Sequence, residues 1–270
     1  MDNRVAIEIT GGVADVRLVR ADKMNALDMA MFEALVAATE RLSKEKGLRA
    51  VVLSGEGRAF CAGLDMGRFA AMKEGGGNGI PGGEKRDLTV RTHGQANFAQ
   101  QAVWGWRQLP VPVIAAVHGV AYGGGFQLAL GADMRYVAPD TKMSIMEIKW
   151  GLVPDMAGTP VLATLMRDDV LRELTYTGRV FSAEEGQRYG LVTRICDDPR
   201  AAALETAREI AAKSPDAIRA AKRMLNSLSV DPGPALLAES VEQQKLIGSP
   251  NQLESVRANI EKRAPRFADG

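Results

Sequence analysis

A short apolar run that leads into three consecutive glycines most constrains how this chain can fold. Residues 111–117 are predicted to form a buried strand, Gly123-Gly124-Gly125 a tight turn, and the following residues an apolar helix. Glycines at a strand-to-helix turn let the backbone approach a ligand closely. The helix start also leaves unpaired N–H groups and the positive end of its dipole pointing at that ligand. Such a turn can bind a phosphate, or it can stabilise a negative oxygen that develops during a reaction.

The composition is ordinary for a globular protein and argues against several classes of function. The chain has 270 residues, of which 46% are hydrophobic and 25% charged, with a net charge of +1. This balance gives no reason to expect nucleic acid or a membrane as a partner. Two cysteines, Cys61 and Cys196, and two histidines, His93 and His118, show no metal-ligand spacing, so no metal is expected. No signal peptide or membrane-length apolar run is visible, and we expect a cytoplasmic protein.

Strands alternate with helices over most of the chain, which predicts an α/β fold with right-handed crossovers. The expected strands cover residues 4–9, 13–19, 50–53, 111–117, 135–137 and 191–195, and the expected helices cover residues 29–46 and 88–108. We divide the chain into a core of residues 1–200 and a helical region of residues 201–270. Residues 73–87, rich in glycine, are predicted to form a mobile surface loop. Trp104 and Trp106 cannot share one helix face, so one of them is expected to leave the core.

A second glycine-containing segment, Ala59-Phe60-Cys61-Ala62-Gly63-Leu64-Asp65, lies between the expected strand 50–53 and a short helix. Asp65 is predicted to cap that helix by accepting from its first N–H groups. The N–H of Leu64 is then expected beside the helix start. Two N–H groups from separate turns, here those of Leu64 and of the glycine turn, are what an oxyanion hole needs.

Together these segments resemble the crotonase superfamily, also called the enoyl-CoA hydratase/isomerase family. Four motifs match in order and spacing, at residues 20–27, 59–65, 119–127 and 147–159, and weaker matches follow at 177–192 and 260–267. The resemblance spans nearly the whole chain. It implies a spiral of ββα units, a helical C-terminal region used for assembly and for closing the site, and a homotrimer or a dimer of trimers.

The same resemblance implies a ligand and a set of binding residues. The ligand is an acyl-CoA thioester, which is the substrate, so no cofactor is implied. Its carbonyl oxygen would accept hydrogen bonds from the N–H groups of Leu64 and Gly124, and each such donor is worth about 2.7–4 kcal/mol in comparable sites. The coenzyme would run along Lys23, Ala62, Asp65 and Met66. Lys262, from this or a neighbouring subunit, would meet the nucleotide phosphates.

Acid and base residues decide the reaction, and here the chain departs from the family's hydratases. Those enzymes have one glutamate just after the glycine turn and another 20 residues later, whereas this chain has Gln127 and Glu147. An amide cannot act as a general base. Asp155, eight residues after Glu147, makes a pattern that resembles the family's dienoyl-CoA isomerases, where two carboxylates shuttle a proton. We therefore predict an enoyl- or dienoyl-CoA isomerase that uses Glu147 and Asp155, with Gln127 holding a water or a substrate oxygen.

Other functions stay open at this stage. A 2-enoyl-CoA hydratase would use Glu147 alone to protonate the α-carbon, with its water held by Gln127. An acyl-CoA dehalogenase or hydrolase would use Asp155 as a nucleophile, but Gln100 stands where the dehalogenases place a histidine base. A non-catalytic acyl-CoA binder would bind its ligand without forming a product. Asp155 can also be no more than a turn residue after proline.

Overall fold

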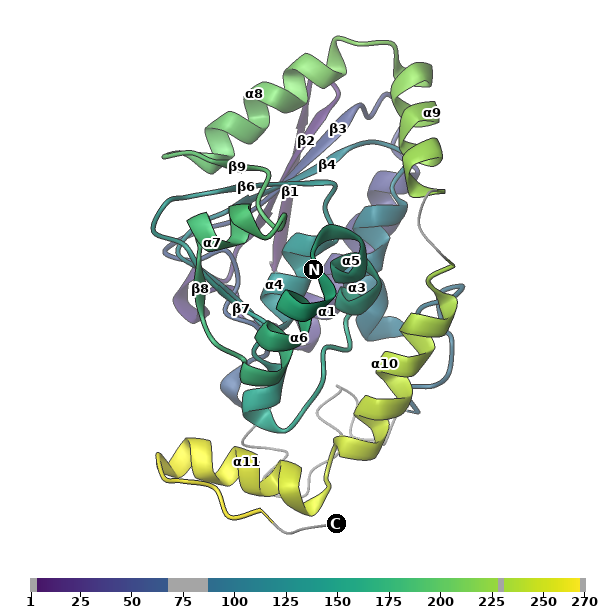
Figure 1. Ribbon diagram of the computed structural model, residues 1–270. Coiled ribbons are helices and arrows are strands. Elements are labelled where there is room, and N and C mark those ends of the chain that lie inside the picture. Colours follow the sequence, from purple (N-terminus) through teal and green to yellow (C-terminus); the bar gives the residue numbers. More distant parts are fainter. Residues whose placement is uncertain (1–3, 68–86, 228–230, 268–270) are drawn as a thin grey trace.

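The computed structural model describes residues 4–67, 87–227 and 231–267, which fold around a six-stranded sheet (Figure 1). The first two strands form the predicted antiparallel hairpin, and every later neighbour in the sheet is parallel. The order is β1-β2-β3-β4-β6-β9. These strands are β1 (Val5–Thr10), β2 (Val13–Leu18), β3 (Ala50–Gly55), β4 (Val113–Val117), β6 (Met134–Val137) and β9 (Arg194–Ile195). The predicted α/β class is confirmed.

Helices cover both faces of this sheet, which explains why its central strands are apolar at successive positions. Val51 and Leu53 pack into the large core with helices on one face, whereas Ala50 and Val52 pack on the opposite face. The first face is covered by α1 (Met29–Ser43), α3 (Phe98–Gln108) and α4 (Gly124–Leu130), and the second by α8 (Pro199–Ala211) (Figure 1).

A smaller sheet continues beyond the carboxyl ends of the main strands. It consists of β5 (Val120–Tyr122), β7 (Lys142–Ser144) and β8 (Phe181–Ser182), with β5 parallel to β7 and β7 antiparallel to β8. Isolated parallel bridges pair Cys61 with Ala121 and Leu27 with Leu64. Three segments that are far apart in sequence therefore lie side by side: the residues before α1, those after β3 and those before α4.

Two expectations for the region of α3 are wrong. The helix predicted over residues 88–108 begins only at Phe98, because Asn97 and Gln100 form a capping box that fixes its start. Trp104 and Trp106 are both buried in the core. Both fit because α3 packs against α1 and also against α4, so two of its sides are covered. The loop predicted at residues 73–87 lies almost entirely outside the described residues.

The other regular elements of the described residues are helices. Short ones connect the strands: η1 (Ala21–Lys23), η2 (Glu147–Trp150), α5 (Gly158–Leu165), α6 (Asp168–Thr177) and α7 (Ala183–Arg188). After α8 the described residues form α9 (Pro215–Asn226), α10 (Gly233–Leu246) and α11 (Pro250–Glu261). In Figure 1, α10 descends along one side of the core and α11 lies below it. Among the described residues, no helix has the length and apolarity needed to cross a membrane.

Candidate active site

Two glycine turns meet: the turn at Gly63 follows β3, and the turn at Gly123 follows β5. Gly63 has a φ of +86°, and a Cβ placed there would lie 2.5 Å from the carbonyl oxygen of Tyr122 and 3.8 Å from the nitrogen of Gly124. Only glycine tolerates both this φ and this approach. Within the described part of the chain, the N–H groups of Leu64 and Gly124 donate no hydrogen bond. The turns thus leave two backbone donors available, as the sequence predicts.

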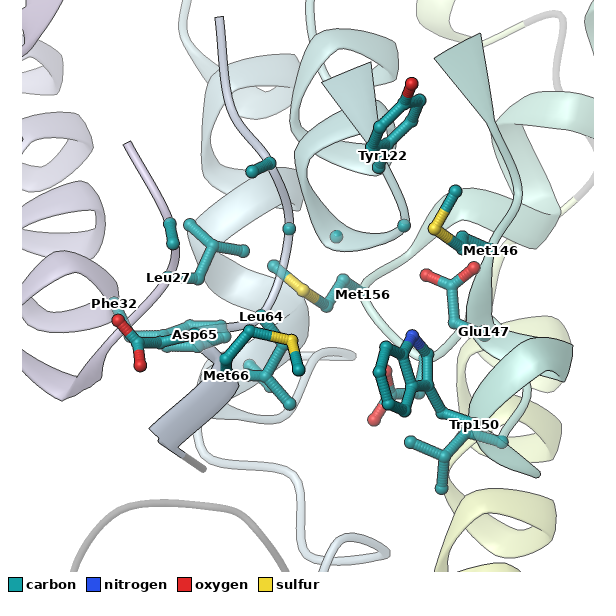
Figure 2. A pocket seen from close by; sticks show the side chains of 18 of the residues that line it. Leu27, Phe32, Leu64, Asp65, Met66, Tyr122, Met146, Glu147, Trp150 and Met156 are labelled. Carbon is teal, nitrogen blue, oxygen red and sulfur yellow. The ribbon is translucent and has the colours of Figure 1, made fainter. Parts of the chain in front are cut away.

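These turns form part of the wall of a pocket of about 860 Å³, a size common for small-molecule sites (Figure 2). Most of the predicted site residues line it: Lys23, Ala62, Leu64, Asp65, Met66, Gly124, Glu147 and Asp155. Apolar side chains complete it, among them Leu27, Phe32, Phe98, Trp150, Leu152 and Met156. In Figure 2, Glu147 lies across the pocket from Leu64 and Met66. Gln127 and Lys262 are not among the lining residues.

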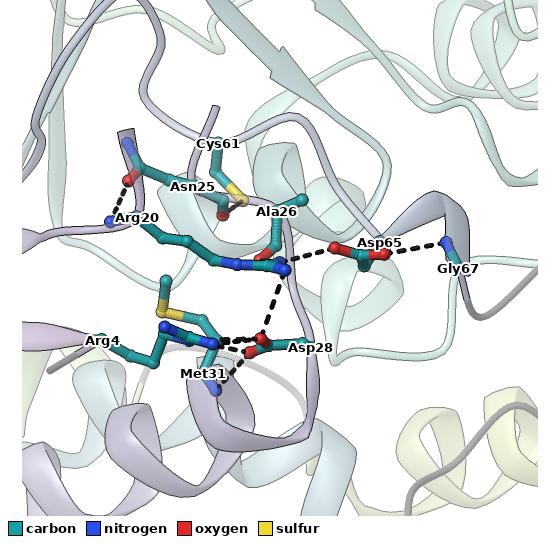
Figure 3. Close-up of polar contacts among 9 residues, drawn as sticks. All are labelled: Arg4, Arg20, Asn25, Ala26, Asp28, Met31, Cys61, Asp65 and Gly67. Carbon is teal, nitrogen blue, oxygen red and sulfur yellow. Dashed lines mark hydrogen bonds and ion pairs between the residues drawn. The ribbon is translucent and has the colours of Figure 1, made fainter. Parts of the chain in front are cut away.

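An ion-pair network holds the turn that carries Leu64 (Figure 3). The Asp65 carboxylate accepts from the Gly67 N–H at 2.8 Å, so Asp65 caps the helix that begins at Met66, as predicted. Its other oxygen accepts from Arg20 at 2.6 Å, and Arg20 also donates to the carbonyl of Ala26 at 2.9 Å. Arg20 therefore ties the Leu64 turn to the residues before α1.

Replacing Asp65 with alanine is expected to lower the free energy of unfolding by about 0.5–2 kcal/mol, the usual cost of a lost helix cap. We also expect KM for an acyl-CoA substrate to rise, because the Leu64 turn loses its tie to Arg20. Urea denaturation and steady-state kinetics measure the two effects. Asp65→Asn keeps an oxygen for the cap but loses the charge, and should fall between the alanine variant and the wild type. Wild-type stability and KM in Asp65→Ala would contradict this role.

Glu147 is a buried carboxyl group that faces the pocket. One oxygen, Oε1, accepts from Gln127 Nε2 at 2.7 Å, and the other, Oε2, is buried with no hydrogen-bond partner in the described structure. Burial raises the pKa of Glu147 to about 7. A Cβ at Gly123 would lie 3.3 Å from Oε1, which places this carboxyl group beside the glycine turn. A group that titrates near neutral pH at such a place is suited to proton transfer.

Gln127 does not have the surroundings of a water-holding residue. It lies behind Glu147, fully buried, and its carbonyl oxygen already accepts from the N–H groups of Met156 and Gly158 at 2.9 and 3.0 Å. Its amide donates to Glu147. The structure therefore does not support the predicted contact of Gln127 with a water or a substrate oxygen. Gln127 instead fixes the orientation of Glu147.

Asp155 lies in the same pocket, between η2 and α5. Burial raises its pKa to about 8, and the nearby carboxylates of Glu239 and Glu147 add to the effect. The Gln243 side chain, which also lines the pocket, hydrogen-bonds to it. The pocket thus contains two carboxyl groups whose pKa values are both well above their ordinary range. Asp155 follows a proline, as a simple turn residue would, but it also lines the pocket.

A third buried carboxylate, Glu239 on α10, was missed by the sequence analysis. It accepts from the N–H groups of Ala157 and Thr159 at 2.9 and 2.8 Å and from Gln100 Nε2 at 3.0 Å. Because Glu239 is 80 residues from Thr159 in the chain, no local motif signals this contact. Burial raises its pKa as well.

Two further predicted positions lie outside the pocket. Gln100, at the place of the dehalogenases' base, is buried and bonded to Asn97 and Glu239. Lys262 ends α11 in the left-handed conformation, with φ +54°. Its predicted contact with nucleotide phosphates stays a prediction. The described residues bring together no set of three His, Cys, Asp or Glu side chains fit to hold a metal ion.

Comparison with known proteins agrees with the fold and the paired turns, which define a crotonase-type protein. Residues 8–270 match the family model for enoyl-CoA hydratase/isomerase, and the chain belongs to this family of enzymes. It is 30% identical to a probable enoyl-CoA hydratase of Bacillus subtilis over 98% of both chains. It is also 30% identical to the mouse mitochondrial Delta(3,5)-Delta(2,4)-dienoyl-CoA isomerase, over 97% of this chain and 81% of that protein.

Solved structures give the same answer for the fold. An enoyl-CoA hydratase/isomerase from Mycobacterium paratuberculosis superimposes with a TM-score of 0.84 at 25% identity, covering 95% of this chain and 98% of that one. The family acts on acyl-CoA thioesters. The large pocket beside the paired turns is therefore the candidate acyl-CoA site.

Proposed function

We propose that this protein is an enoyl- or dienoyl-CoA isomerase that moves a proton along an unsaturated acyl chain. The observation that carries the proposal is the presence of two carboxyl groups with raised pKa values, Glu147 and Asp155, on the wall of one pocket. Gln127, the residue a hydratase would need for its second water contact, lies behind Glu147 instead. The similarity to a dienoyl-CoA isomerase is in line with this reading.

The first step breaks a C–H bond at the α-carbon. With the thioester oxygen on the N–H groups of Leu64 and Gly124, the α-carbon lies toward Glu147, which is beside the same turn. Ionised Glu147 takes the proton, and the electron pair moves onto the thioester oxygen as an enolate. The two backbone donors stabilise that developing charge.

In the second step Asp155 supplies a proton to a carbon farther along the chain. The electron pair returns from the enolate, the double bond moves, and Asp155 is left ionised. The negative charges of Glu239 and Glu147 both add to the raised pKa of Asp155, which favours Asp155 as the acid and Glu147 as the base. A proton passes from Glu147 to solvent and from solvent to Asp155, which resets the pair.

Product analysis in deuterated water tests the proposal. Purified protein is given 2-enoyl-, 3-enoyl-, 2,4-dienoyl- and 3,5-dienoyl-CoA, and the products are analysed by mass spectrometry. We expect a product with a moved double bond and solvent deuterium at the carbon protonated by Asp155. A product heavier by one water would establish hydration by Glu147 and overturn the isomerase assignment. Binding without any product would favour the non-catalytic binder.

We also propose that the family's assembly and coenzyme path apply here. The chain would form a homotrimer or a dimer of trimers, with the helical region 201–270 at the subunit contacts and Lys262 near the nucleotide phosphates. The coenzyme would pass Lys23, Ala62 and Met66, all of which line the pocket. Light scattering of the purified protein measures the mass of the assembly, and a monomer would contradict the proposal.

A further inference from the structure

Four successive backbone N–H groups follow Asp155, and all of them donate to just two side chains, Gln127 and Glu239. The N–H groups of Met156 and Gly158 donate to Gln127 Oε1, whereas those of Ala157 and Thr159 donate to the Glu239 carboxylate. Those of Gly158 and Thr159 are among the donors that the start of α5 leaves without partners inside the helix, and those of Met156 and Ala157 come just before it. The turn is strained, because Ala157 has a φ of +64° without being glycine.

Hydrogen bonds and the helix dipole favour the charged form of Glu239. Its carboxylate accepts three N–H hydrogen bonds, from Ala157, Thr159 and Gln100, and lies at the positive end of α5. Hydrogen bonds to the charged form favour that form. The negative charge of Glu239 raises the pKa of both Asp155 and Glu147.

The charged groups around Glu239 come from three other parts of the fold. Asp155 and Glu147 face it from the pocket side, and both feel its negative charge. Arg91 faces it from the residues before α3 and acts through Gln100, which accepts from Arg91 at 3.0 Å and donates to Glu239 at 3.0 Å. Arg91 therefore supports the negative charge of Glu239 through Gln100, and this charge lies close to two other carboxyl groups.

We propose that Glu239 is a positioning residue that fixes the Asp155–Thr159 turn and places a negative charge beside the two pocket carboxyl groups. That charge opposes ionisation of Asp155, so it keeps the proton on Asp155 until the acyl chain takes it. Gln127 completes the frame, because it joins the same turn to Glu147. The inference rests on the proposed isomerase function for its kinetic consequence only, since the contacts and the charge do not depend on the reaction.

The test compares Glu239→Gln with the wild type in two measurements. Infrared titration without substrate follows the C=O band of protonated carboxyl groups, and the band that is lost in Asp155→Asn identifies Asp155. In the wild type we expect this band to vanish as pH rises through about 8, and in Glu239→Gln to vanish at lower pH. The basic limb of the kcat/KM profile for isomerisation should move the same way, with KM at neutral pH changed much less. Glu242→Gln, an exposed residue of the same helix, is the control and should match the wild type.

The Asp155 band and kcat together decide whether Glu239 acts through its charge, through its hold on the turn, or through both. An Asp155 band that titrates as in the wild type would overturn the proposal, even if kcat falls, because the loss would then be structural. Glu239→Asp keeps the charge, but its side chain is too short to reach the turn as well as glutamate does. In this variant the Asp155 band should titrate as in the wild type, whereas kcat should fall severalfold. If Glu239→Gln fails to fold, wild-type kcat in Glu239→Asp overturns the positioning role. A shifted band together with a hydrated product would reject the isomerase function and keep the role of Glu239.

Discussion

Replacing Glu147 with glutamine is expected to lower kcat by about 10²–10⁴-fold on every substrate that the wild type turns over, the usual contribution of a general acid or base. The amide has almost the same shape, and its oxygen can still accept from Gln127, which donates to Oε1 at 2.7 Å. What it lacks is a proton that can be taken up and released. Steady-state kinetics measure the loss, and calorimetry with acyl-CoA should show that binding is retained.

The same variant should not lose stability. The folded-state pKa of Glu147 is raised to about 7, so its contribution to stability is fully present below its ordinary pKa and is lost as pH rises through about 7. Oε2 is buried without a partner, and a neutral amide removes that charge. Exposed Glu33 on α1, changed to glutamine, is the matched control and should keep full activity. Near wild-type turnover in Glu147→Gln would leave Asp155 as the only carboxyl group of the pair needed for chemistry.

Local sequence patterns predict the two turns well, because their chemistry is local. A strand, a glycine that alone tolerates the backbone angle, and a helix start occur within a dozen residues at Gly63 and again at Gly123. Asp65 also follows from local rules, since a cap needs only the N–H two residues later. The family motifs then place Glu147 and Asp155 in one pocket with these turns.

The roles of Gln127 and Glu239 could not be predicted in this way. Each bonds the residues 156–159 from a distance of 29 or more positions along the chain, and neither sits in a pattern that signals those contacts. Gln127 follows the glycine turn, a place that suggests contact with substrate, yet the turn after Asp155 folds back and uses its carbonyl oxygen twice. Tertiary packing therefore decides which polar side chains reach the pocket and which support it.

Replacing Asp155 with asparagine is expected to lower isomerisation by about 10²–10⁴-fold, because the proton for the distal carbon then has no donor. Removal of the α-proton needs only Glu147 and the two backbone N–H groups, so exchange of α-hydrogen with deuterated water should continue. Asp155→Asn should therefore lose isomerisation and keep exchange, whereas Glu147→Gln should lose both. This difference distinguishes the role of Asp155 from that of Glu147. NMR of the recovered acyl-CoA measures exchange, and absorbance of the conjugated product measures isomerisation.

The pH profile of the wild type follows from the same assignment. Isomerisation needs Glu147 ionised and Asp155 protonated, so kcat/KM should fall on the acid side as Glu147 gains its proton near pH 7 and on the basic side as Asp155 loses its proton near pH 8. With the two values this close, a narrow bell is expected. The residual α-hydrogen exchange of Asp155→Asn should keep the acid limb and lose the basic one. Equal loss of exchange and isomerisation in Asp155→Asn would instead show that Asp155 acts before the enolate forms, and would overturn its role as the second-step acid.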